Sequence, residues 1–143
     1  MFQRILLAWD GSKVALRAFD AAIDLTRRYD AELVAVSIAY TPAHAETTAD
    51  RNETAHAAHH YLTQTFEEVI DRAQRAGVEV SHEVIDGQTP AKALLEYAHT
   101  HGFDLIVCGH HHGGRVGRLL LKDVAAELIE NGAPILVIND EPR

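Results

Sequence analysis

The sequence predicts an α/β protein of one domain, with a five-stranded parallel sheet that is doubly wound by helices on both faces. Two observations predict this fold class. Short apolar segments rich in β-branched residues alternate with longer segments of helical periodicity, and glycine, proline or small polar residues separate them. In addition, 143 residues with 47% hydrophobic composition are enough for one substantial core.

Five segments are expected to be strands: residues 3–9, 31–40, 78–85, 103–109 and 133–139. The first two are apolar runs and are expected to be buried. Residues 78–85 alternate between apolar and polar side chains, as a strand does. A helical segment lies between each strand and the next, so consecutive strands are expected to be parallel and joined by crossovers. The helices are expected over residues 13–30, 53–76, 90–101 and 116–131.

Local signals support the ends and the inner faces of these helices. Ser12 is expected as an N-cap and Gly77 as a C-cap residue, and Pro90 lies in a first turn, where proline is favoured. A surface loop is expected from Thr41 to Asp50. The spacing of side chains predicts the inner face of the first helix as Val14, Ala18, Ala21, Ala22 and Leu25, and that of the second as Tyr61, Thr65, Phe66, Val69 and Ala73.

The composition argues against several classes of function. A formal net charge of -8 disfavours general binding to nucleic acid or to anionic membranes. No apolar run is long enough to cross a bilayer and no leader pattern is seen, so we expect a cytoplasmic protein. The single cysteine, Cys108, excludes an internal disulfide and a multi-cysteine zinc site, and it is expected to be a small buried hydrophobe.

Ligands of doubly wound sheets bind beyond the carboxyl ends of the strands, near the point where the strand order reverses. The candidate loops are therefore WDGS at 9–12, SIAY at 37–40, DGQT at 86–89 and CGHHHGG at 108–114. The last loop is rich in glycine, as phosphate-binding loops are, because glycine lets backbone N–H groups approach phosphate oxygens. It also contains consecutive histidines, which are common metal ligands.

Across residues 3–139 the chain resembles the universal stress protein family. The order and spacing of five pieces carry the resemblance: RILLAWDGS at 4–12, AELVAVSI at 31–38, G-x-x-P at 87–90, FDLIVCG at 103–109 and APILVIN at 133–139. The resemblance implies one domain over residues 1–143, an adenine nucleotide alpha hydrolase-like sheet, and a homodimer formed by antiparallel pairing of the last strands. The implied interface is Pro134, Ile135, Leu136, Val137, Ile138 and Asn139. Pairing with a second copy would also cover an apolar edge strand.

Many members of this family bind ATP or AMP through a loop of the form Gly-x-x-Gly-x9-Gly-Ser/Thr. Only Gly109 matches it here, because His112, Lys122 and Asp123 stand at the other three diagnostic positions. Pairing Gly109 with Gly113 instead restores no Gly-Ser further along. A carboxylate at Asp123 would repel phosphate oxygens unless it were protonated or bridged by a metal. The sequence therefore predicts that a triphosphate is not held in the usual way.

Other positions fit the adenosine half of such a site. The resemblance implies that Asp10 accepts hydrogen bonds from ribose hydroxyls and that the backbone of Ile38 meets adenine. Trp9 is larger than the small residue usual at its position, and it either narrows the pocket or fills it. Three cations either replace the lost phosphate donors or are solvated helix charges: Arg115, Arg118 and Lys122. The candidate nucleotide-binding residues are Ala8, Trp9, Asp10, Ile38, Gly109, His111, His112, Gly113, Arg115, Lys122, Asp123 and Val124.

The histidines allow a metal hypothesis. Successive residues of an extended segment point to opposite sides, so at most two of the run His110, His111 and His112 are expected to face one ion. On the second helix, His56 with His59 or His60 has the spacing of another chelating pair. No third ligand is identified for either set, and solvated histidines are the simpler interpretation.

No catalytic residue is assigned. Ser12 and Ser37 lack the setting of a nucleophile, and no metalloprotease or Walker motif is present. The sequence predicts a non-enzymatic regulatory or protective module whose partners are a second copy and a regulatory protein, with no nucleic acid and no membrane. Two alternatives stay open. One is a protein that binds AMP, ADP or ATP with a rebuilt phosphate end, and the other is a metal-binding module that uses His110, His111 and His112.

Overall fold

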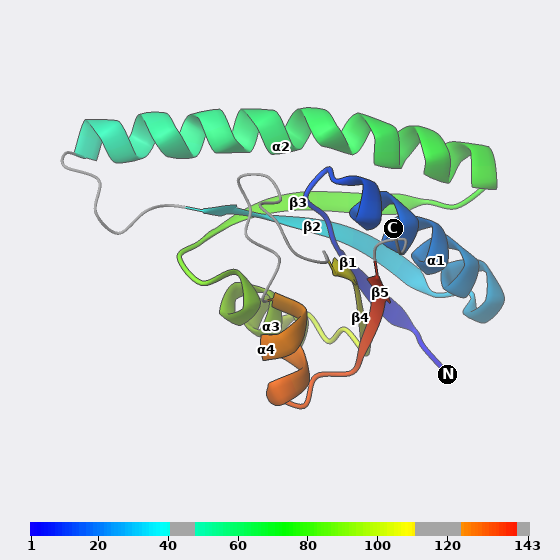
Figure 1. Ribbon diagram of the computed structural model, residues 1–143. Helices are drawn as coiled ribbons and strands as arrows, with labels where there is room; N and C mark the ends of the chain where they lie inside the picture. The colour runs from blue at the N-terminus through cyan, green and yellow to red at the C-terminus, as the bar shows by residue number, and fades with distance from the viewer. Residues whose placement is uncertain (41–47, 111–123, 140–143) are drawn as a thin grey trace.

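The computed structural model describes residues 1–40, 48–110 and 124–139, and it has the predicted α/β architecture (Figure 1). Its strands are β1 (Arg4–Ala8), β2 (Glu32–Tyr40), β3 (Val80–Gly87), β4 (Leu105–His110) and β5 (Ile135–Asn139). Its helices are α1 (Lys13–Tyr29), α2 (Thr48–Ala76), α3 (Pro90–Thr100) and α4 (Val124–Glu130). Each helix lies in sequence between two strands, as crossover connections require.

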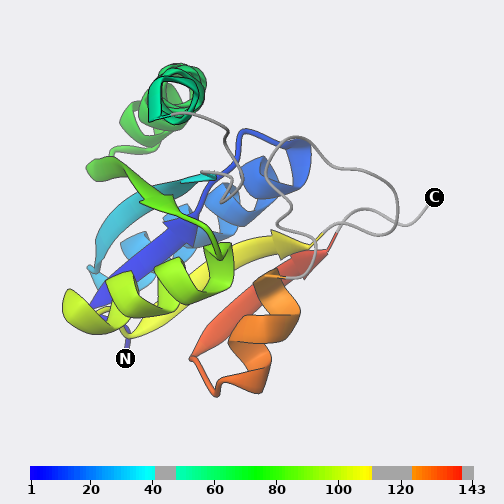
Figure 2. The same cartoon turned by 90° about the vertical axis from the view of Figure 1, so that its left-hand side faces the viewer.

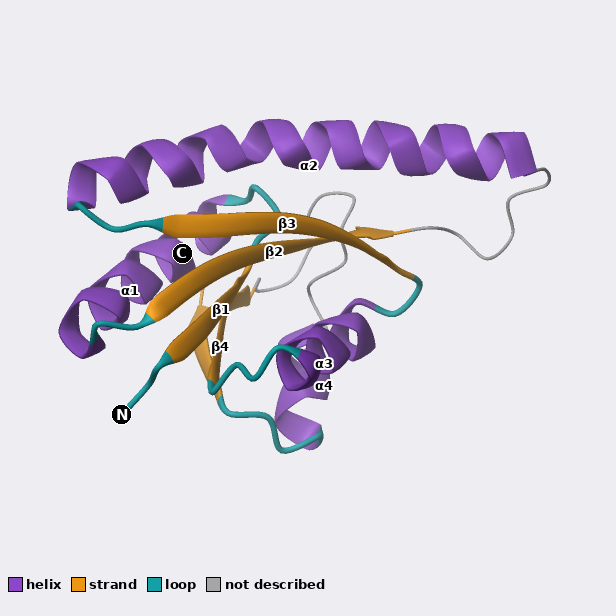
Figure 3. Ribbon diagram, turned by 180° about the vertical axis from the view of Figure 1, so that it is seen from behind, coloured by secondary structure: helices purple, strands orange, loops and turns teal. Residues whose placement is uncertain are grey.

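The five strands form one sheet in the order β3-β2-β1-β4-β5, and every pairing in it is parallel. Figure 3 labels the first four strands of this order. The chain builds outward from β1 through β2 to β3, and then crosses to the other side of β1 for β4 and β5. The strand order therefore reverses between β1 and β4. The crevice at the carboxyl ends of these two strands is where a sheet of this kind is expected to hold a ligand.

Helices cover both faces of the sheet, with α1 and α2 on one face and α3 and α4 on the other (Figure 2). Alternate residues of a strand enter the two layers. In β1, Ile5 and Leu7 pack under α1 and α2, whereas Leu6 and Ala8 pack under α3 and α4. The central strand is thus buried on both sides, which explains why its sequence is a continuous apolar run.

The predicted start of α1 is confirmed, and its inner face differs in part. Ser12 has an extended backbone and its Oγ accepts a hydrogen bond from Ala15 N at 3.2 Å, as an N-cap does. Ala21 and Leu25 are only half-buried, because they lie at the border of the buried stripe. That stripe consists of Val14, Ala15, Ala18, Phe19, Ala22, Ile23 and Thr26.

Helix α2 is longer than predicted, and its buried face agrees with the prediction at Phe66, Val69 and Ala73 but not at Tyr61. It starts at Thr48 instead of Glu53, because each residue added to an existing helix gains a backbone hydrogen bond. Tyr61, expected inside, is 47% exposed, and its neighbour Leu62 is buried instead. One residue turns a helix by about 100°, so only one of the two can face the sheet. The buried stripe of α2 contains Leu62, Phe66, Val69 and Ala73.

Other boundaries differ by a few residues or lie outside the described ranges. Of the loop expected over 41–50, residues 48–50 are helical and 41–47 are not described. The described part of the helix expected over 116–131 is α4, and residues 116–123 are not described. Pro134 precedes β5. In the described ranges, no helix combines the length and apolarity needed to cross a membrane.

Cys108 lies in β4 and is 2% exposed, which confirms the expectation of a small core hydrophobe. Burial raises the pKa of its thiol to about 12. We therefore predict that the folded protein at about pH 8 reacts with Ellman's reagent far more slowly than the chain in denaturant, because the thiolate is the reactive form.

The same shift predicts how stability depends on pH. The native pKa of Cys108 lies above its unfolded value of about 8.5. Hence its contribution to the free energy of unfolding is fully present below about pH 8.5 and is lost as the pH rises toward about 12. We predict from urea denaturation across this pH range that the free energy of unfolding declines less steeply with pH in Cys108→Ala than in the unmodified chain. Equal declines in the two proteins would contradict the raised pKa of Cys108.

Candidate functional site

The loop after β1 lies at the carboxyl end of the sheet, beside the point where the strand order reverses. Asp10 is 8% exposed, and its Oδ1 accepts hydrogen bonds from Ser12 N at 2.9 Å and from Ser12 Oγ at 2.5 Å. Ser12 Oγ in turn accepts from Ala15 N. One carboxylate oxygen therefore ties the loop to the first turn of α1, where the partial positive charge of the helix end also favours an anion.

The Trp9 side chain packs in the core under α1 and α2 and is 3% exposed. Its Nε1 donates to Thr65 Oγ1 of α2 at 2.9 Å. Its backbone is also held, because N donates to Val36 O at 2.9 Å and O accepts from Ser37 Oγ at 2.6 Å. The large side chain thus belongs to one layer of the core, whereas Ile38, the candidate for contact with a base, belongs to the other.

Three other candidates lie together in the layer under α3 and α4: Ala8, Ile38 and Val124. All three are buried. Their side chains pack against other apolar groups of that layer and form part of the core.

Gly109 lies where β4 passes the first turn of α1. A Cβ atom at this position would be 2.9 Å from Val14 Cγ1 and 3.0 Å from the backbone C and O atoms of Val14. Because a close-packed interior cannot accept such contacts without moving, the packing of α1 on β4 requires glycine here. The first glycine of the family motif therefore has a structural explanation of its own.

Most of the predicted phosphate end lies outside the described residues. This applies to His111, His112, Gly113, Arg115, Arg118, Lys122 and Asp123. Of the remaining candidates, Asp10 and Gly109 are brought to the same place, because both contact the first turn of α1. The first turn of α1 thus contacts both the loop after β1, through Ser12, and the end of β4, through Val14.

Two of the described histidines join neighbouring elements of the fold. His110 Nδ1 lies 3.2 Å from Asn139 Oδ1, which joins the ends of β4 and β5. His59 Nε2 lies 2.8 Å from Asp86 Oδ1, which joins α2 to the end of β3. Over residues 1–40, 48–110 and 124–139, no group of three or more histidine, cysteine or acidic side chains could hold a metal ion.

The last strand, β5, lies at one edge of the sheet. Its apolar residues Ile135, Leu136, Val137 and Ile138 are half-buried, and Pro134 and Asn139 on either side are exposed. Pro134 O accepts from Ile106 N, so alternate residues from 134 onward direct their backbone groups to β4. Ile135 and Val137 then direct theirs to the outer edge.

Sequence reasoning missed one neighbour of the crevice loop, Thr65. It was expected only as one position on the inner face of α2, yet it contacts Trp9 and lies against Gly11. The available signal was a polar residue within an apolar helix stripe. Such a residue needs a hydrogen-bond partner when it is buried, and the sequence alone does not identify that partner.

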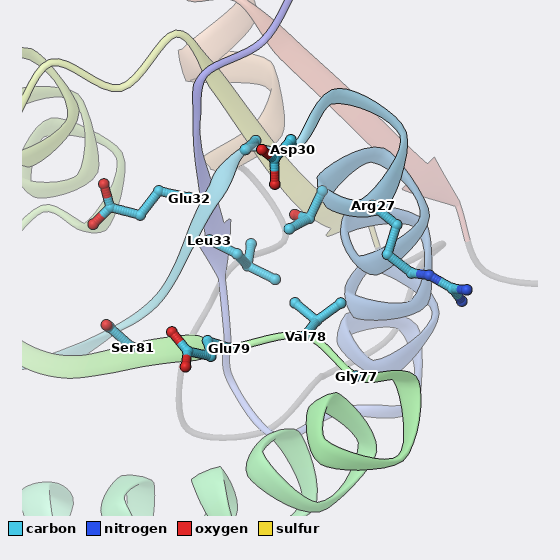
Figure 4. A pocket seen from close by; sticks show the side chains of 10 residues that line it. Arg27, Asp30, Glu32, Leu33, Gly77, Val78, Glu79 and Ser81 are labelled. Carbon is cyan, nitrogen blue, oxygen red and sulfur yellow. The ribbon is translucent and has the colours of Figure 1, made fainter.

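A separate hollow of about 600 Å³ lies at the opposite end of the sheet, at the start of β2 and β3 (Figure 4). Asp30, Glu32 and Glu79 line it, and Figure 4 shows the Arg27 side chain extending away from these carboxylates. The carboxyl ends of α1 and α2 add partial negative charge there. The described lining includes no predicted nucleotide-site residue, and its Glu32 pairs with Arg4 at 3.0 Å.

The contact between Gly109 and Val14 predicts a coupled loss of stability. Gly109→Ala should lower the free energy of unfolding by about 1–3 kcal/mol, as overpacking does. Val14→Ala removes Cγ1 but leaves the backbone contacts, so the double variant should lose less stability than the sum of the single variants. Urea denaturation of all four proteins measures this coupling. Wild-type stability of Gly109→Ala would show that packing does not require the glycine.

Known proteins share both the sequence pattern and the fold. The profile of the Universal stress protein family matches residues 1–139. A universal stress protein of Methanocaldococcus jannaschii is 28% identical over 143 aligned residues, which cover 96% of this chain and 82% of that protein.

Solved structures agree with this match. A member of the family from Burkholderia pseudomallei has a TM-score of 0.75 at 25% identity, with 96% of each chain covered. A universal stress protein in complex with cAMP has a TM-score of 0.70 at 24% identity, with 96% of this chain and 97% of that chain covered. Because the family profile matches nearly the whole chain, and the strands and helices follow the expected order, this chain belongs to the universal stress protein family.

Proposed function

We propose that this chain is a non-enzymatic regulatory or protective module of the cytoplasm, which acts as a homodimer through contacts with a partner protein and does not take ATP in the usual way. The observation that carries the proposal is the structural use of the two family residues kept at the crevice. Asp10 Oδ1 is engaged by Ser12, and Gly109 packs against Val14. Neither residue requires a nucleotide to explain its presence.

The altered glycine motif supports the same proposal. His112, Lys122 and Asp123 replace residues that would bring backbone and hydroxyl donors to phosphate oxygens. A carboxylate at Asp123 adds repulsion where the family places a hydroxyl. The two family residues that are kept, Asp10 and Gly109, therefore have structural roles, whereas the residues that would bind a triphosphate are replaced.

The roles of the hydroxyl and thiol groups support a non-enzymatic module. Ser12 Oγ donates to Asp10 and accepts from Ala15 N, and Ser37 Oγ donates to Trp9 O. The raised pKa of Cys108, about 12, keeps its thiol protonated at neutral pH, and a thiol is a poor nucleophile. Each of these groups has a structural role.

A second candidate function is binding of AMP, ADP or ATP with a rebuilt phosphate end. Its support is the position of Asp10 at the carboxyl end of β1, beside the reversal of strand order, together with the cAMP held by a protein of the same fold. Arg115 and Lys122 would then supply charge in place of the lost donors.

Calorimetric titration separates the two candidates. We predict no binding heat for ATP, AMP or cAMP, with or without Mg²⁺ or Zn²⁺. The triple variant His112→Gly, Lys122→Gly and Asp123→Ser should gain ATP binding, because it restores the family motif. Micromolar binding of any nucleotide by the unmodified chain would overturn the first proposal in favour of the second. If the triple variant does not bind ATP, the altered motif is not what prevents ATP binding.

The homodimer is proposed to form by antiparallel pairing of two β5 strands. Val137→Pro removes a backbone N–H that is directed to the outer edge, and it leaves the bonds to β4 in place. We predict that sedimentation velocity finds a dimer for the unmodified chain and a monomer for this variant. Val137→Ala is the matched control, because it shortens the side chain but keeps the N–H, and it should remain dimeric. A monomeric unmodified chain at about 100 μM would sink the proposal.

A further inference from the structure

Thr65 is a residue of α2 whose hydroxyl makes two hydrogen bonds at once. It accepts from Trp9 Nε1 at 2.9 Å and donates to Leu62 O at 2.6 Å. The bond to Leu62, one helical turn earlier, fixes the direction of the hydroxyl hydrogen, so a lone pair is turned toward the indole. The hydroxyl thus anchors Trp9, the residue before Asp10, to α2.

The methyl group of Thr65 contacts the residue after Asp10. Gly11 has a φ of 81°, a conformation that favours glycine, and a Cβ atom there would be 2.9 Å from Thr65 Cγ2. The absence of a side chain at position 11 therefore lets α2 approach the loop closely. Thr65 contacts the loop on both sides of Asp10, through its hydroxyl on one side and its methyl group on the other.

Other contacts of this loop come from the sheet and from α1. Trp9 is held by β2 through Val36 O and Ser37 Oγ, and Asp10 is held by Ser12 at the start of α1. These contacts fix the start of the loop at the sheet and its end at α1. The contact with α2 holds the loop residues between the sheet and α1.

We propose that Thr65 is a positioning residue for the crevice: it fixes the loop of residues 9–12 and couples the placement of α2 to that of Asp10. This proposal rests on the proposed function only because it takes the crevice as the functional site. A displacement of the loop by anything that enters the crevice is transmitted to α2 through Thr65, and a displacement of α2 is transmitted to Asp10. The two effects are equal in free energy, because coupling between sites is reciprocal.

The first test separates the hydroxyl from the methyl group in the unliganded protein. Thr65→Val keeps the shape and removes the hydroxyl, whereas Thr65→Ser keeps the hydroxyl and removes the methyl. In two-dimensional ¹⁵N NMR spectra, the chain's one indole N–H should exchange with solvent about tenfold faster in Thr65→Val, and the Gly11 and Ser12 amide signals should move. Thr65→Ser should keep slow indole exchange.

A matched control is available on the same helix. Thr63 is exposed on α2, so Thr63→Val makes the same chemical change without touching the loop. It should leave the indole, Gly11 and Ser12 signals in place. If Thr65→Val moves those signals no more than Thr63→Val does, Thr65 does not position the loop and the proposal is overturned.

The second test runs in the opposite direction, from the loop to α2. Gly11→Ala should shift amide signals of residues 62–66, and adding Thr65→Ser should return them toward wild type, because the contacting methyl group is gone. Gly102→Ala is the control, since Gly102 has a φ of 70° but no atom near its missing Cβ. Equal shifts from both alanine variants, or no recovery in the double variant, would refute the coupling. Neither test uses a nucleotide, so the outcome of each can be interpreted even if the proposed function is wrong.

Discussion

The close approach of the first turn of α1 to the ends of β1 and β4 is the constraint on which the rest of the crevice depends. It needs glycine at position 109, because any side chain there would meet Val14. It also needs Ser12, which caps the helix and holds Asp10. Since β1 and β4 flank the point of strand reversal, this helix turn lies beside the place where sheets of this kind bind their ligands.

Much of the fold could be predicted because its signals are local. Apolar runs identified four of the strands, the alternation of residues 78–85 identified β3, and Ser12 and Pro90 identified helix starts. The errors arose where neighbouring residues compete for one position. Tyr61 and Leu62 are both apolar enough to be buried, and only the packing of α2 on the sheet decides which one faces inward.

The site was harder to predict because its contacts join residues far apart in the chain. The direction of Trp9 was available from the alternation along β1, since Ile5, Leu7 and Trp9 enter the same layer. Its hydrogen bond to Thr65, 56 residues away, was not available, because no local pattern specifies that partner. The topology located the candidate loops and the family resemblance named residues in them, but neither could separate a residue kept for ligand from one kept for packing.

The acidic hollow at the start of β2 and β3 has a consequence for how the molecule meets other ions. Helices that follow parallel strands all direct their amino ends to one end of the sheet and their carboxyl ends to the other. Here Asp30, Glu32 and Glu79 line the latter end, whereas Arg27, Arg28 and Arg75 lie in the last turns of α1 and α2, and Arg4 pairs with Glu32. The arginines complement the helix dipoles and offset part of the carboxylate charge. An ion that approaches this end therefore meets groups of both signs, so charge alone does not exclude anions there.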